Sequence, residues 1–142
     1  MSPFSRSLTS LTFLFLAAPA MAMPTGTFEC KSPDGKFIAN FYISNYGLHV
    51  LGEVTELTID GKELDPAKAK ARVSRQWVTT STGNVTVSIP AEDVFSRDLV
   101  IETSSRDGSA YEGRLQLLER TDEYSSPEKA VRTAPVACEW VP

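Results

Sequence analysis

GTFECKSPDGKFIANFYI, residues 26–43, is the stretch that decides the fold class of this chain. Apolar and polar side chains alternate before the Pro33-Asp34-Gly35 turn signal, and the second half places its apolar residues on one face: Phe37, Ala39, Phe41 and Ile43. A period of two is the pattern of a β-strand, because successive side chains point to opposite faces. Pro presets φ and Gly accepts positive φ, which predicts a tight turn. We therefore expect two strands joined by a turn, the second of them central because its other face carries Ile38 and Tyr42.

The same pattern recurs at short intervals along the chain. Further strands are expected over 48–59 with a bulge at Gly52, after the Asp60-Gly61 hairpin signal, and over 72–80, 85–89, 99–103, 110–120 and 136–141. Connections are expected at 81–84, 91–98 and 121–135, and the side chain of Phe95 in the second of them is expected to pack into the core. The spacing predicts an all-β fold: a single small antiparallel β-barrel or β-sandwich of roughly seven to eight short strands.

Residues 65–72 (DPAKAKAR) fit two structures. Asp65 followed by Pro66 is a typical helix start, and the Ala/Lys composition also favours a helix. The alternation of small and basic residues running into Val73 favours a strand instead. We expect a short helical turn near 66–70 that leads into the strand over 72–80.

Residues 1–22 match a secretory signal peptide. Arg6 is their only charged residue, an apolar run extends from Leu8 to Ala18, and Ala20-Met21-Ala22 offers the small residues of a cleavage site. Spanning a membrane takes roughly 20 apolar residues, more than this run supplies. We therefore expect a cleaved leader over 1–22 and a single exported β-domain over 23–142. Its expected location is the periplasm or the exterior, with no transmembrane segment in the mature chain.

The chain has two cysteines, Cys30 and Cys138, near the two ends of the expected domain. In an oxidising compartment this pair predicts one disulfide. The bond would join the first expected strand to the last, at the seam where an open sheet exposes its edges. No C-x-x-C sequence occurs and His49 is the only histidine. A metal site is therefore not expected.

Charge argues against one class of partner. The chain carries 14 Lys and Arg against 18 Asp and Glu, and loss of Arg6 with the leader would leave a formal net charge of −5. An acidic domain repels phosphate backbones, so nucleic acid is not an expected partner.

No arrangement of residues indicates catalysis. His49 lies in an apolar run, where an ordinary strand histidine is the simpler interpretation, and no G-x-S-x-G sequence supplies a nucleophile. Paired acids such as Glu53 and Glu56 could serve glycoside hydrolysis, but solvated surface acids explain them equally. We expect a non-enzymatic protein without a cofactor.

Basic and aromatic residues provide a candidate binding face. Lys68, Lys70, Arg72 and Arg75 are the one basic concentration in an acidic domain, which suits an acidic partner or a lipid headgroup, although a solvated face explains them as well. Trp77 and Tyr111, with Tyr42, Tyr46 and Tyr124, would add contact area unless they fill the core. The candidate binding face comprises Lys68, Lys70, Arg72, Arg75, Trp77 and Tyr111.

The segments Phe28-Glu29-Cys30 and Cys138-Glu139-Trp140 resemble the frame of the periplasmic C-type lysozyme inhibitors. Those are small exported β-barrels whose terminal strands are linked by a disulfide. The resemblance covers these two short ends alone. Gly108-Ser109-Ala110-Tyr111 departs from that family's S-G-x-x-Y loop, and its Y-x-x-K-G motif has no match. The resemblance implies a role as an envelope binding or inhibitor protein.

These observations lead us to expect a periplasmic or secreted domain that binds an envelope protein or another envelope component. Two alternatives remain: a periplasmic inhibitor of a cell-wall hydrolase, and a carrier of a small ligand. A small hydrolase that uses paired carboxylates is the least favoured interpretation.

Overall fold

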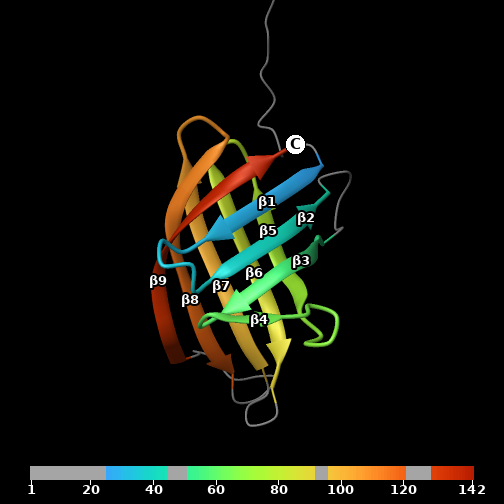
Figure 1. Ribbon diagram of the computed structural model, residues 1–142. Helices are drawn as coiled ribbons and strands as arrows, with labels where there is room; N and C mark the ends of the chain where they lie inside the picture. The colour runs from blue at the N-terminus through green and yellow to red at the C-terminus, as the bar shows by residue number, and fades with distance from the viewer. Residues whose placement is uncertain (1–24, 45–50, 92–95, 121–128) are drawn as a thin grey trace, which may run out of the picture.

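The computed structural model describes residues 25–44, 51–91, 96–120 and 129–142, so the expected leader over 1–22 lies outside the described residues. Within them, nine strands form one antiparallel sheet: β1 (Gly26–Lys31), β2 (Ile38–Ile43), β3 (Glu53–Ile59), β4 (Lys62–Leu64), β5 (Arg72–Val78), β6 (Thr82–Pro90), β7 (Ser96–Ser105), β8 (Ala110–Arg120) and β9 (Lys129–Val141). The sheet curls strongly into a half-barrel, so that β1–β4 cross in front of β5–β7 (Figure 1). The all-β prediction is confirmed, with nine strands instead of seven to eight.

The strand order is β4-β3-β2-β1-β9-β8-β7-β6-β5. Strands that follow one another in the chain are neighbours throughout, except that β4 and β5 lie at opposite edges and β1 pairs with β9. The first and last strands pair with each other as expected, but the expectation that they close the seam of the sheet is wrong. They pair at its middle, and the break falls between β4 and β5 because β4 is only three residues long and a turn replaces further pairing.

The two strands of residues 26–43 form as expected. β1 and β2 pair from Gly26 opposite Ile43 to Lys31 opposite Ile38. In the turn between them Gly35 has a φ of 72°, and the Oδ1 atom of Asp34 accepts hydrogen bonds from the Lys36 amide at 3.0 Å and the Ser32 hydroxyl at 2.7 Å. Local turn chemistry therefore sets this hairpin.

The Asp60-Gly61 hairpin signal is confirmed, and the turn expected over 81–84 is displaced. Asp60 and Gly61 both have positive φ, at 52° and 79°, as a two-residue hairpin turn requires. Gly108 has a φ of 77° in the turn between β7 and β8. The turn expected over 81–84 lies one or two residues earlier, because β6 already begins at Thr82.

Two segments expected as connections are partly strand. Ser96–Asp98 belongs to β7, whereas Phe95 lies outside the described residues. β9 begins at Lys129, so 129–135 is paired with β8 despite its polar composition and Pro135. The hydrogen bonds of this segment depend on the neighbouring strand more than on its own side chains, which explains why the sequence pattern misses it.

The concave side of the sheet carries the core. Phe28 packs edge-to-face on Tyr111, with ring centroids 5.1 Å apart, and both side chains are fully buried. The buried side chains on β6 are Val85, Val87 and Ile89, and those on β8 include Tyr111, Leu115 and Leu117. The Tyr111 hydroxyl donates to the Thr79 carbonyl at 2.5 Å, which satisfies the polar end of a buried ring.

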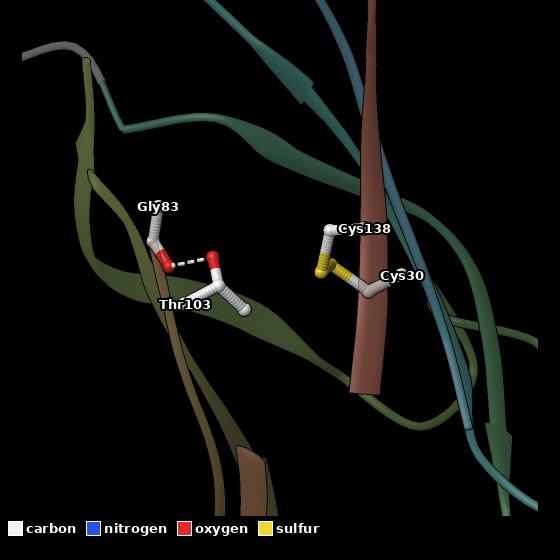
Figure 2. Close-up of a disulfide and its surroundings, with 4 residues drawn as sticks. All are labelled: Cys30, Gly83, Thr103 and Cys138. Carbon is white, nitrogen blue, oxygen red and sulfur yellow. Dashed lines mark hydrogen bonds between the residues drawn. A yellow bond between two sulfur atoms is a disulfide. The ribbon is translucent and has the colours of Figure 1, made fainter. Parts of the chain in front are cut away.

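The predicted disulfide joins Cys30 to Cys138, which are directly opposite in β1 and β9 with Cα atoms 4.1 Å apart. Its sulfur atoms face the Thr103–Gly83 hydrogen bond across the inside of the sheet (Figure 2). In that bond the Thr103 hydroxyl donates to the Gly83 carbonyl at 2.7 Å. A structural disulfide of this kind indicates an oxidising, extracytoplasmic environment.

Reduction of the disulfide should lower the melting temperature. The bond links residues 108 positions apart, and a closed loop of that length contributes roughly 4–5 kcal/mol in the chain-entropy model. Calorimetry of the oxidised protein, with and without reductant, measures the effect. Cys30→Ser should melt like the reduced protein and respond to reductant no further; equal melting of all samples would contradict the expectation.

Gly83→Ala should destabilise the domain by about 1–3 kcal/mol, the usual cost of overpacking a core. A Cβ atom there would lie 2.6 Å from Phe28 Cζ and 2.7 Å from Thr103 Oγ1. Chemical denaturation measures the change. The adjacent exposed change Asn84→Ala should stay within about 0.5 kcal/mol. Equal effects of the two variants would show that β6 does not pack this closely on β1.

Stability should fall as the pH drops from about 4 to about 2, in part through Asp107. Hydrogen bonds from the Ala110 and Ser109 amides hold the pKa of this carboxyl at about 2, below its ordinary value of 3.8. A carboxyl whose pKa is lower in the folded protein than in the unfolded chain stabilises the fold at pH values above its unfolded pKa. This contribution is lost as the pH falls through the folded pKa. Asp107→Asn should flatten this part of the pH–stability curve; an unchanged slope would contradict the assignment.

Candidate functional site

The structure brings five of the six candidate binding residues to one edge of the sheet. Lys68 and Lys70 lie in the turn between β4 and β5, and Arg72, Arg75 and Trp77 lie on β5. All five are exposed. Tyr111 is not part of this surface, because its side chain is fully buried against Phe28. We call the exposed side chains of Lys68, Lys70, Arg72, Arg75 and Trp77 the β5 surface.

The segment before β5 forms the expected helical turn. Asp65 Oδ1 accepts hydrogen bonds from the amides of Ala67 at 3.0 Å and Lys68 at 3.4 Å, as an N-cap does. The Ala69 amide donates to the Asp65 carbonyl at 2.9 Å, and Lys70 ends the turn with a φ of 53°. Ala69 and Ala71 pack against the core, whereas Ala67 and the two lysines are exposed.

A β-bulge places the two arginines of β5 on one face. Arg72 lies opposite Ser88 and Arg75 opposite Thr86, and the pairing shifts register between Val73 and Arg75. In a regular strand residues three apart point to opposite faces. The extra residue, Ser74, therefore brings Arg72 onto the outer face that already carries Arg75 and Trp77.

The arginines of the β5 surface differ from most others in their surroundings. Elsewhere Arg97, Arg114, Arg120 and Arg132 each pair with a carboxylate, at N–O distances of 3.2–3.5 Å. Within the described parts of the chain, neither Arg72 nor Arg75 has an ion pair, nor do Lys68 and Lys70. The neighbours of Arg72 and Arg75 on β6 are Ser88 and Thr86, whose hydroxyl groups do not neutralise the positive charges.

Trp77 is the most exposed large apolar side chain that the structure describes, at 64%. It lies opposite Asn84 of β6 and next to Gln76, whose Oε1 atom accepts a hydrogen bond from the Gly52 amide at 2.6 Å. Leu51, 48% exposed, precedes that glycine, and Tyr42, 46% exposed, lies opposite Glu53. The Gly52–Gln76 hydrogen bond links β5 to the residue that precedes β3.

Sequence reasoning missed a second surface feature, on the outer face of β1 and β9. Glu29 and Glu139 lie directly opposite each other there, and the row continues through Asn40 to Glu56. The Asn40 amide donates to Glu56 at 2.8 Å. These residues border a hollow of about 560 Å³. No sequence spacing reveals this row, because its members come from four strands and meet only through the pairing of β1 with β9.

Several sequence predictions lie outside the described residues. His49 is one of them, together with Tyr46 and Tyr124 of the aromatic set. In the part of the chain that is described, no group of three or more His, Cys, Asp or Glu side chains is placed to hold a metal ion. Nor does any helix of that part have the length and apolar character to cross a membrane.

Comparison with known proteins gives no family assignment. No family model matches the chain, and no curated protein or solved structure is significantly similar to it.

Proposed function

We propose that this protein is an exported, non-enzymatic β-domain that binds a protein or another component of the cell envelope through the β5 surface. The exposed Trp77, which follows the uncompensated Arg72 and Arg75 on the same face of an edge strand, carries the proposal. Tryptophan and arginine are the residues most enriched among those that dominate binding energy at interfaces.

Two observations support an extracytoplasmic location. Residues 1–22 have the charge, apolar run and small-residue site of a leader peptide. The disulfide between Cys30 and Cys138 is stable where thiols are oxidised. Together they favour the periplasm or the exterior as the place where a partner is met.

The cost of leaving Trp77 in water supports a binding role for it. Exposed tryptophan is unusual in a domain whose other tryptophan, Trp140, is buried at the end of β9. Isolated apolar residues on a surface need no explanation, whereas a group of them marks an interaction site. Trp77 shares the outer face of β5 with Arg72 and Arg75, so it belongs to a mixed aromatic and basic surface and is not isolated.

The packed interior favours a surface site over an enclosed ligand. Phe28, Phe41 and Tyr111 are fully buried within the curl of the sheet, together with Leu99 and Ile101. Side chains of this size occupy the space that a carrier would need for its ligand. Binding is therefore proposed on the outside of the half-barrel.

Trp77→Ala should abolish capture of the partner without unfolding the protein. The oxidised protein is immobilised and exposed to an envelope extract from its source, and bound components are identified by mass spectrometry. A single dominant component should be captured by the native protein and lost with Trp77→Ala, because a truncated hot-spot residue costs about 2 kcal/mol or more. The melting temperature should be unchanged, since the side chain is exposed.

Tyr42→Ala is the matched control for loss of an exposed aromatic residue farther from the arginines. The Tyr42→Ala protein should capture more of the partner than the Trp77→Ala protein does. Capture that is indifferent to Trp77, or turnover of glycans or esters by the purified protein, would refute the proposed function.

A further inference from the structure

We infer that the partner of the β5 surface is an acidic polypeptide segment, narrow enough to contact β5 and its preceding turn without covering the rest of the sheet. This inference rests on the proposed function and specifies the partner of the same site. It follows from the charges on the surface, from what borders them, and from the strand edge they occupy.

Charge complementarity selects an anionic partner. The β5 surface combines four cations within residues 68–75, in a chain with a formal net charge of −4. None of them has an ion pair among the residues that the structure describes. Arginine binds carboxylates through two parallel hydrogen bonds, and Arg72 and Arg75 present this group on one face because of the bulge.

The borders of the surface select a narrow partner. Glu53 is exposed and follows Gly52, whose amide is bonded to Gln76 of β5. On the other side, the row that starts at Trp77 and Asn84 continues to Glu102 of β7, which is exposed and pairs with Arg114. A flat anionic membrane would press against these carboxylates as well as the cations. An extended acidic segment meets the cations alone.

The edge position disfavours a second copy of β5 as the occupant. β5 pairs only with β6 among the described strands, so its other edge is a possible site for strand addition. Antiparallel pairing of two β5 strands about their centre would place Arg75 against Arg75 of the second copy, and directly opposed like charges destabilise a sheet. The same charge attracts a strand that carries Glu or Asp.

The test measures binding of a short fluorescein-labelled peptide in which Glu alternates with Leu, by fluorescence anisotropy on the oxidised protein. The native protein should bind this peptide at low ionic strength and lose it as salt is added, because exposed charges are screened. The same peptide with Gln in place of Glu should bind at least about tenfold more weakly, since its charges are removed.

Charge reversal locates the site. Arg72→Glu combined with Arg75→Glu should weaken binding of the acidic peptide at least about tenfold, because both attractive contacts become repulsive. Arg106→Glu combined with Lys31→Glu is the matched control, because it changes the net charge by the same amount. Both residues are exposed, lie outside the β5 surface and have no ion pair among the described residues, so this variant should leave binding unchanged. Equal loss in both variants would show that net charge alone acts, and would overturn the inference.

Further measurements separate the alternatives. The protein should bind vesicles that contain phosphatidylglycerol no better than vesicles of phosphatidylcholine alone. Binding to the phosphatidylglycerol vesicles without binding to the peptide would assign the surface to a membrane and overturn the inference. Salt-sensitive self-association in sedimentation, lost on Arg72→Glu with Arg75→Glu, would assign it to a second copy. If capture from the extract depends on Trp77 but the acidic peptide does not bind, the inference of an acidic partner is refuted and the proposed function stands.

Discussion

The antiparallel pairing of β1 with β9 is the contact on which the rest of the structure depends. These strands come from opposite ends of the described domain, and bringing them together costs the closure entropy of nearly the whole chain. The packing of Phe28 on Tyr111 and the covalent bond between Cys30 and Cys138 offset that cost. Every other pair joins strands that follow each other, so their loops are short. Once β1 meets β9, two hairpin arrays become one continuous sheet.

This pairing also decides where the sheet is open. A chain whose first and last strands meet in the middle must place its two edges at strands from the middle of the sequence, and these are β4 and β5. Short edge strands and edge strands with bulges or charges are protected from unwanted pairing. β4 is short, and β5 is bulged and charged. In this protein the same residues also form the β5 surface. Arg72 and Arg75 would oppose pairing with a second copy of β5, and the proposed acidic partner would bind to these same residues.

The surface charges show why the β5 surface is distinctive in an acidic protein. Arg97, Arg114 and Arg120 lie on inner strands of the sheet, where carboxylates of the neighbouring strand pair with them. Among the described strands β5 pairs only with β6, which places Ser88 and Thr86 beside the arginines. An edge strand with a hydroxyl-rich neighbour thus keeps its positive charges unpaired. The bulge at Ser74 then gathers them beside Trp77.

The sequence by itself determined the local features: the inward faces of β1 and β2, the turns at Gly35 and Gly61, and the capped turn after Asp65. These depend on side-chain alternation and on φ preferences, which act over a few residues. It also identified the basic residues, but it grouped Tyr111 with them, although that residue shares its alternation with buried Leu115 and Leu117. Only the tertiary structure decided that β9 extends back to Lys129, that Trp77 is exposed while Trp140 is buried, and that Glu29 faces Glu139. Each of these depends on which strand lies alongside, and strand pairing between distant segments is set by packing of the whole sheet, which no local pattern encodes.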